Sequence, residues 1–246
     1  YAPSMTAPGQ RGRYAIIPAH DHQDALIPLV VEMTSQVDLV IIIDNASDPP
    51  ISHTALFAAR IVAFGEDLKR EGVGRMWLWR DAEQPPNLTR LWNSGLSGAA
   101  SDAKGRGLTE WDVAVLNDDV VIQPGWFAAV ADRMRETGAA AACMWPGNQH
   151  LQQSGTTLRH LYGAAFVLRG ELAAKPGDPI WPDERLRWWG GETELDLRAQ
   201  RNGGTLRVSG PLVPNLRANA STVGPLAEQA GRDRETFKEI TGWYGW

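Results

Sequence analysis

The clearest indication of the fold comes from residues Trp111-Asp-Val-Ala-Val-Leu-Asn-Asp-Asp-Val-Val-Ile-Gln-Pro-Gly-Trp126. It begins with a mostly apolar run, typical of a strand that is covered on both faces. The run ends in Asn117-Asp118-Asp119, and Pro124 then begins a helix whose apolar residues are Trp126, Phe127, Val130 and Met134. The stretch therefore predicts a strand, an acidic turn at its carboxyl end, and a helix.

Two earlier segments have the same layout. Tyr14–Pro18 is a short apolar run, and residues 22–36 follow it with apolar side chains at helical spacing. Pro28 is tolerable in this helix only near its first turn. Val37–Ile43 is a second buried-type strand, which ends abruptly at Asp44. A strand followed by a helix, repeated along the chain, predicts right-handed βαβ units and a mostly parallel sheet.

The connecting segments carry weaker signals. Residues 53–60 suggest a short helix, and residues 60–64 and 75–79 are weaker strand candidates. Asn87 is a typical N-cap for a helix with Leu88, Leu91, Trp92 and Leu96 on one face. Residues 98–109 are small and polar, so we expect a loop there.

The second half of the chain has a looser pattern. Strands are expected at 139–145, 163–168 and 205–208, with one helix at 192–201. Residues from Asn215 onward are small and polar, and we expect them to form a tail along the surface. The fold class is thus α/β, with a mostly parallel central sheet and flanking helices.

Composition excludes several classes of protein. Of 246 residues, 43% are hydrophobic and 22% charged, which is ordinary for a globular domain. The net charge of −5 gives no overall basic field, so nucleic acid is not favoured as a partner. The single cysteine, Cys143, lies in an apolar run and is expected to be a buried, inert thiol. No apolar run is long enough to span a membrane and none resembles a secretory signal, so a cytoplasmic protein is expected.

Acidic residues follow two of the predicted strands. In an open parallel sheet, the carboxyl edge is where ligands bind. Asp118 and Asp119 are adjacent carboxylates that suit Mg²⁺ or Mn²⁺ shared with a diphosphate, although a solvated acidic turn is the alternative. Asp44 could accept hydrogen bonds from a nucleobase or ribose, or could bond to its own turn.

A third acidic cluster lies in Trp188-Trp-Gly-Gly-Glu-Thr-Glu-Leu-Asp-Leu-Arg198. Glu194 and Arg198 are spaced for a surface salt bridge on a helix. Glu192 follows a sharp Gly190-Gly191 turn, and Trp188 and Trp189 can shield it from water. A carboxylate in such a setting can act as a general base with a raised pKa.

Together these segments resemble the inverting, family 2-type glycosyltransferases of the GT-A fold. Four segments match in order, followed by two on the acceptor side: Tyr14–Ala19, Val40–Ser47, Asn87–Gly98 and Val115–Trp126, then Gly163–Arg169 and Gly191–Arg198. The Val115–Trp126 segment resembles the metal-binding Asp-x-Asp motif of that family. Two departures are Asn117 in place of the first Asp and Glu192 in place of the family's Asp base.

The resemblance implies a role for each matching residue. Those expected at the donor are Pro18, Ala19, Asp44, Arg90, Asn93, Asn117 and Asp118. Asp119 is the expected metal ligand, Glu192 the catalytic base, and Trp188, Trp189 and Gly163 the acceptor-side residues. The implied donor is a UDP- or GDP-sugar with Mn²⁺ or Mg²⁺ as cofactor, and a hexose or pentose would pass to a glycan, lipid, protein or modified nucleobase with inversion. A homo-oligomer stays open.

The same resemblance sets the expected domain organisation. Residues 14–215 form a single GT-A domain, divided into a nucleotide-sugar-binding half (14–120) and an acceptor-binding half (121–215). The rest forms an N-terminal tail (1–13), whose first four residues we interpret as left from cloning, and a C-terminal tail (216–246).

Two other functions fit the sequence less well. A sugar nucleotidyltransferase would carry a Gly-rich, basic loop after its first strand, where this chain has Ala19-His-Asp-His-Gln23. A non-catalytic nucleotide-sugar or glycan-binding module would bind the donor without turnover. His20 and His22 lack a third ligand at any recognised spacing, so we interpret them as part of a loop or helix start.

Overall fold

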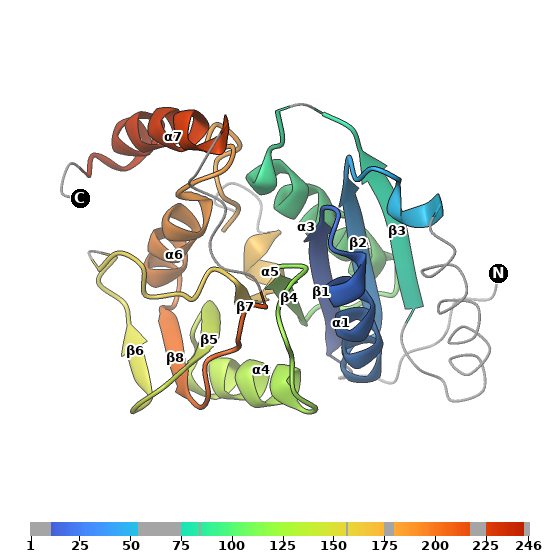
Figure 1. Ribbon diagram of the computed structural model, residues 1–246. Coiled ribbons are helices and arrows are strands. Elements are labelled where there is room, and N and C mark those ends of the chain that lie inside the picture. The colour runs from blue at the N-terminus through green and yellow to red at the C-terminus, as the bar shows by residue number, and fades with distance from the viewer. Residues whose placement is uncertain are drawn as a thin grey trace.

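A computed structural model describes residues 11–53, 75–83, 85–155, 157–174, 180–216 and 225–243. Its centre is one eight-stranded sheet with strand order β3-β2-β1-β4-β7-β5-β8-β6. Helices cover both faces of this sheet (Figure 1). The expected helix at 53–60 and strand at 60–64 lie outside the described residues.

The first half of the sheet is parallel throughout. Its elements are β1 (Gly12–Ala19), α1 (Gln23–Gln36), β2 (Leu39–Asn45), the 3₁₀ turn η1 (Ile51–His53), β3 (Arg75–Asp81), α3 (Leu88–Gly105) and β4 (Trp111–Leu116). β1 pairs in parallel with both β2 and β4, and β2 with β3. The register places Ala19 beside Asp44, so the carboxyl ends of β1 and β2 meet.

The second half of the sheet is mixed. Its elements are α4 (Trp126–Thr137), β5 (Ala141–Trp145), β6 (His150–Gln152), β7 (Ala165–Arg169), α5 (Gly170–Ala173), α6 (Gly191–Arg201), β8 (Thr205–Ser209) and α7 (Pro225–Thr241). β7 runs antiparallel to β4 and β5, whereas β5 and β8 are parallel. Because β7 is reversed, its first residue, Ala165, lies beside the last residue of β4, Leu116.

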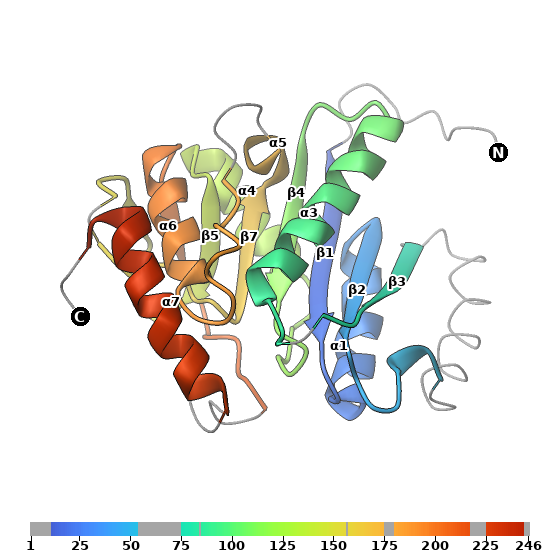
Figure 2. The same cartoon turned by 90° about the horizontal axis from the view of Figure 1, so that it is seen from above.

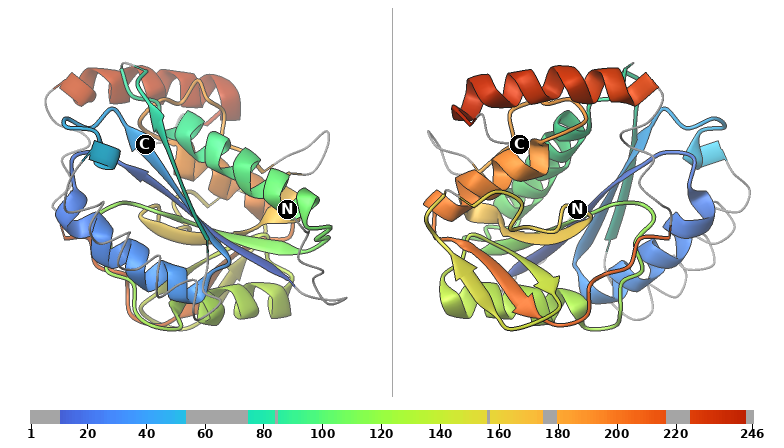
Figure 3. Two further views of the ribbon diagram at one scale, coloured as in Figure 1. Left: turned by 90° about the vertical axis from the view of Figure 1, so that its right-hand side faces the viewer. Right: turned by 60° about the vertical axis from the view of Figure 1, so that its left-hand side comes forward.

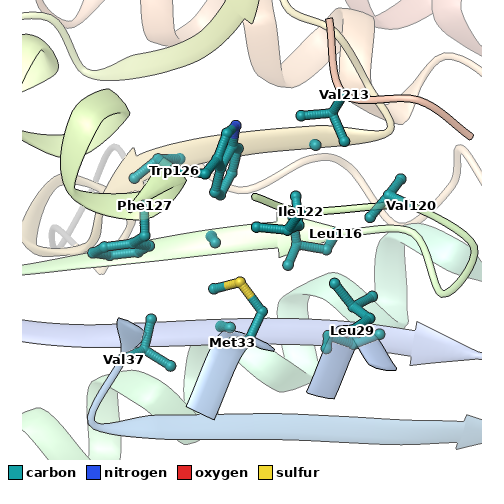
Figure 4. Close-up of a cluster of buried hydrophobic side chains, with 14 of the residues drawn as sticks. Leu29, Met33, Val37, Leu116, Val120, Ile122, Trp126, Phe127 and Val213 are labelled. Atoms are coloured by element: carbon teal, nitrogen blue, oxygen red, sulfur yellow. The ribbon is translucent and has the colours of Figure 1, made fainter. Parts of the chain in front are cut away.

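Alternate residues of the central strands form two cores. Ile17 and Ile42 belong to the core under α1 and α4, whereas Ile16 and Ile41 belong to the core under α3. In the first core, Met33 of α1 lies close to residues of α4 and β4 (Figure 4). Burial of each such side chain stabilises the folded state by at most about 1.5–3 kcal/mol relative to leaving it exposed. Strands buried on both faces explain why the sequence shows apolar runs rather than alternation.

Helix α3 is longer than the sequence suggests. The residues expected to form a loop from 98 onward continue the helix to Gly105, so that expectation was wrong. Ala99 and Ala103 are buried against the sheet, and Gly95 allows close approach, because a Cβ there would lie 2.5 Å from Ile16. Small residues that looked loop-like therefore serve tight packing. Asn87 caps the helix as predicted, accepting the N–H of Arg90 at 3.0 Å.

Two other local expectations need correction. Pro28 lies inside α1 rather than near its first turn. The polar C-terminal segment forms the 17-residue helix α7, which packs across α6 (Figures 1 and 2). Its Phe237 joins Leu186 and Leu197 in a third small core. Within the described residues, no helix is both long and apolar enough to cross a membrane.

Candidate functional site

The carboxyl edge of the sheet gathers most of the expected site residues. The ends of β1, β2 and β4 meet there, and the backbone N–H of Asn117 donates to the carbonyl oxygen of Ala164 at 2.9 Å. The loop before β7 is thereby attached to the end of β4. Figure 3 shows this edge from two sides, with α1 and α3 on opposite faces of the sheet.

Asp44 lies at this edge, but its carboxylate is held by its own loop. It is 2% exposed, and its two oxygens accept the backbone N–H groups of Ser47 at 2.9 Å and Ile51 at 3.1 Å. This is the self-bonded turn that the sequence left open for Asp44. Its contact with a nucleobase stays a prediction, as does that of Pro18 and Ala19, which are buried at the end of β1.

Asp118 connects the end of β4 to the turn after β1. Its carboxylate accepts the backbone N–H of His20 at 2.8 Å and lies 3.2 Å from Nδ1 of His22. Burial raises the pKa of Asp118, and the neighbouring charge of Asp119 acts in the same direction. His20 in turn lies 2.7 Å, through Nδ1, from the carbonyl oxygen of Asn45. The two histidines thus belong to a loop, as interpreted from the sequence.

Asp119 differs from its neighbour. Its side chain is 9% exposed, and within the described ranges its carboxylate has no hydrogen-bond or ion-pair partner. Its carbonyl oxygen accepts the N–H of Leu216 at 2.8 Å, which brings Asn215 opposite Val120. Burial, and next the charge of Asp119, raises the pKa of the Tyr162 phenol.

Glu192 lies against Gly163. It is the second residue of α6, directly after the Gly190-Gly191 turn, in which Gly190 has φ 84°. A Cβ atom at Gly163 would lie 2.8 Å from Cγ of Glu192, so these two expected site residues touch. Burial raises the pKa of Glu192; its own backbone N–H and Arg159 lower that pKa, and Asp196 raises it.

The other acidic residues of α6 have structural partners. Asp196 is fully buried and accepts the N–H groups of His160 at 2.6 Å and Leu161 at 3.3 Å. Glu194 forms the predicted ion pair with Arg198 and also accepts the N–H of Asp183 at 3.1 Å.

Arg90 and Asn93 on α3 contact protein groups rather than open space. Arg90 ion-pairs with Asp81 at 2.5 Å and Glu83 at 2.9 Å. Asn93 donates to the carbonyl oxygen of Pro182 and to Glu184, both at 3.0 Å. Its Oδ1 is buried and lacks a partner in the part of the chain that the structure describes. The Nε atom of Arg90 is likewise buried without a partner among the described residues.

Trp188 and Trp189 precede the glycine turn and contact α7. Both backbone N–H groups donate to Asp233 at 2.7 Å. The indole of Trp189 packs edge-on against Phe237, with the guanidinium groups of Arg159 and Arg234 at 5.7 and 5.3 Å from the ring centre. The sequence did not indicate this attachment, nor the positions of Tyr162 and Asn215.

The described residues suit a metal ion only if substrate phosphates supply part of its coordination shell. No group of three His, Cys, Asp or Glu residues within the described ranges could hold one. Mg²⁺ and Mn²⁺ are often bound through one or two carboxylates with substrate phosphates completing the shell. Asp119 fits this arrangement because its carboxylate has no protein partner among the residues that the structure describes, whereas Asp118 is already hydrogen-bonded.

Comparisons with known proteins find no relative by sequence but do find similar structures. No family profile matches the sequence, and no curated protein matches it. The structure is similar to Staphylococcus aureus TarS 1–349, with TM-score 0.56, 10% identity, and coverage of 94% of this chain and 74% of that one. A longer TarS chain gives 0.55 at 12% identity over 82% of this chain, which spans only 36% of that structure.

A third similar structure is TarS 1–349 in complex with UDP. Its TM-score is 0.54 at 12% identity, covering 82% of this chain and 59% of that one. At such identity the likeness shows the fold alone. The chain has a mixed α/β fold of the GT-A type, with a mostly parallel sheet flanked by helices.

Proposed function

We propose that this protein is a glycosyltransferase that transfers a sugar from a nucleotide diphosphate to an acceptor hydroxyl with inversion. The fold supports this, and one of the similar TarS structures holds UDP. The observation that carries the proposal is the loop before β7, which connects the two acidic clusters. The carbonyl oxygen of Ala164 accepts the N–H of Asn117, two residues before Asp119, and Gly163 touches Glu192.

The chemistry follows from the two carboxylates. Glu192 accepts the proton of the acceptor hydroxyl while that oxygen forms a bond to the anomeric carbon. The bond from the anomeric carbon to the donor diphosphate breaks, and the diphosphate leaves with the electron pair. Mn²⁺ or Mg²⁺ bound at Asp119 would supply positive charge that neutralises the leaving diphosphate.

The raised pKa of Glu192 suits this role. A base is most effective when its pKa approaches the working pH, and burial moves the pKa of Glu192 in that direction. Gly163, an expected acceptor-side residue, is half-exposed where it touches Glu192. The donor sugar and a cytoplasmic location stay predictions.

The test combines donor binding with turnover. A panel of UDP-glucose, UDP-N-acetylglucosamine and GDP-mannose, each with Mn²⁺, is screened by thermal shift and then for slow donor hydrolysis. We expect one donor to raise Tm, and Glu192→Gln to lower its turnover by at least about a hundredfold, since general bases contribute 10²–10⁴-fold. Glu192→Gln should keep or raise Tm at neutral pH, because a group with a raised folded-state pKa loses its stabilising contribution as pH rises.

Glu194→Gln is the matched control, two residues along the same helix. It weakens the ion pair with Arg198, so it should lower Tm and leave turnover unchanged. No thermal response to any nucleotide sugar would remove the donor assignment. A bound donor with no turnover, and no effect of Glu192→Gln, would instead indicate a binding module.

A further inference from the structure

The C-terminal helix α7 contributes a buried carboxylate to the segment that leads to Glu192. Asp233 is 0% exposed. One of its oxygens accepts hydrogen bonds from the backbone N–H groups of Trp188 and Trp189, each at 2.7 Å. The other oxygen accepts a hydrogen bond from Nε2 of Gln229 at 2.7 Å. All three donors are neutral, and no Lys, Arg or His in the described ranges ion-pairs with Asp233.

Burying a carboxylate beside neutral donors alone costs free energy unless its hydrogen bonds are well placed. A carboxylate loses much of its hydration on burial, and only short, charge-assisted bonds offset that loss. A surface helix needs only apolar contacts to dock, and α7 already has Phe237 in the small core with Leu186 and Leu197. The buried charge is therefore not explained by docking alone; it fixes the backbone at Trp188 and Trp189.

That backbone leads directly to the proposed base. After Trp189 come Gly190 in the left-handed region, at φ 84°, and Gly191, the first residue of α6. A Cβ at Gly190 would lie 3.3 Å from Phe237 of α7, and one at Gly191 would lie 2.2 Å from Thr89 of α3. The turn is thus enclosed between α7 and α3, with Glu192 as the next residue.

We infer that Asp233 is a positioning residue for Glu192, and that α7 is part of the catalytic unit. The inference rests on the proposed function. Asp233 holds the two peptide N–H groups before the glycine turn, and the turn sets the position of Glu192 against Gly163. Loss of this anchor moves the carboxylate relative to the reacting groups, and a misplacement of 1 Å can cost about a hundredfold in rate.

Three substitutions at Asp233 separate positioning from stability. Asp233→Asn keeps an oxygen that can accept both N–H groups. Hydrogen bonds to a neutral amide oxygen are weaker than those to a carboxylate but are still formed, so kcat should stay within about threefold of wild type. Asp233→Leu leaves two buried N–H groups without an acceptor, which costs about 1–3 kcal/mol. Asp233→Glu keeps charge and acceptors but displaces them by one methylene.

We expect Asp233→Leu and Asp233→Glu to lower kcat for hydrolysis of the responsive nucleotide sugar by more than about tenfold. Donor KM and the Kd for UDP with Mn²⁺ should not change, because the substitution acts on the backbone before Glu192 and not on the carboxyl ends of β1, β2 and β4. Hydrogen exchange at the amides of Trp188 and Trp189 should accelerate in Asp233→Leu and stay slow in Asp233→Asn. If Asp233→Leu does not fold, the Glu and Asn variants carry the test.

Asp112→Asn is the control. Asp112 is also 0% exposed, but it lies at the amino end of β4 and ion-pairs with Arg135 at 2.6 Å. It should lower Tm and leave kcat unchanged. Wild-type kcat in Asp233→Leu with accelerated exchange at the two amides would overturn the inference. A fully active Glu192→Gln would instead overturn the proposed base, which is a separate result.

Discussion

The two sides of the sheet edge use the same residue types differently. On the β1–β2 side, the carboxylates of Asp44 and Asp118 accept backbone N–H groups and hold their loops. On the β7–α6 side, Asp119 has no side-chain partner within the described residues, and Glu192 faces a glycine. The contrast teaches that position at the carboxyl edge does not distinguish a structural carboxylate from one available to a ligand. The hydrogen-bond partners do.

The largest expected contrast is between Asp119 and Asp44. Asp119→Asn removes a charge that no protein group in the described chain requires, so Tm should change little. Turnover should fall by at least about a hundredfold, the usual cost of losing a preorganised electrostatic group. Asp44→Ala leaves the N–H groups of Ser47 and Ile51 without an acceptor, so the free energy of unfolding should fall by about 1–3 kcal/mol or more.

Both variants are measured by chemical denaturation and by hydrolysis of the donor identified in the panel. The comparison fails if Asp119→Asn is as destabilised as Asp44→Ala, because Asp119 would then be structural. The comparison gains a second difference if Asp44→Ala also weakens UDP binding at a temperature where the variant is folded. That result would give Asp44 the nucleoside contact expected from the sequence in addition to its loop.

A pair of glycines gives the next contrast. A Cβ at Gly163 would lie 2.8 Å from Glu192, whereas a Cβ at Gly95 would lie 2.5 Å from Ile16 in the core. Gly163→Ala should lower kcat by about tenfold to a hundredfold by displacing Glu192, with little loss of stability. Gly95→Ala should lower the free energy of unfolding by about 1–3 kcal/mol through overpacking, with kcat retained in the folded fraction.

Thermal unfolding and single-turnover hydrolysis distinguish the two. Equal loss of stability in both variants would mean that the Gly163 loop is as tightly packed as the core. Unchanged kcat in Gly163→Ala would show that Glu192 adjusts without cost, and would weaken the link on which the proposed function depends.

Part of the fold follows directly from the sequence. The strands β1, β2 and β4 are recognisable because burial on both faces requires uninterrupted apolar residues such as Ile41–Ile43. The end of α3 is not recognisable, because alanines and glycines selected for close packing resemble a loop. Helix α7 has few apolar residues, and its docking depends on Asp233 and Phe237 meeting a distant segment.

The site shows the same limit. The acidic clusters after β4 and in α6 are visible because they follow an apolar run and a pair of glycines. Only the family resemblance separated Asp118 from Asp119 as the expected metal ligand. Residue type could not do so, since the difference in their partners lies in which one faces the turn at His20. The position of Tyr162 is equally invisible, because only the antiparallel placement of β7 beside β4 brings the loop before β7 to the end of β4. Contacts between segments far apart in the chain carry this information.

The smallest expected effect concerns the pH dependence of turnover. Glu192 must be unprotonated to act as a base, so kcat/KM should rise with pH through its pKa. Burial raises this pKa above the ordinary value of 4.5, which places the acidic limb at higher pH than for an exposed glutamate. Arg159 opposes that rise, so Arg159→Gln removes a nearby positive charge and should move the limb to still higher pH.

The change in kcat/KM at a fixed pH on this limb should be less than about tenfold, because a pair with an exposed arginine contributes about 0.2–1 kcal/mol. It should also shrink in high salt. Arg201→Gln, at the far end of the same helix, is the control and should leave the limb in place. If Arg159→Gln leaves the limb unmoved at low salt, the titrating group is not Glu192. The base would then belong among the other carboxylates of this edge, with Asp118, whose pKa is also raised by burial, as the first to examine.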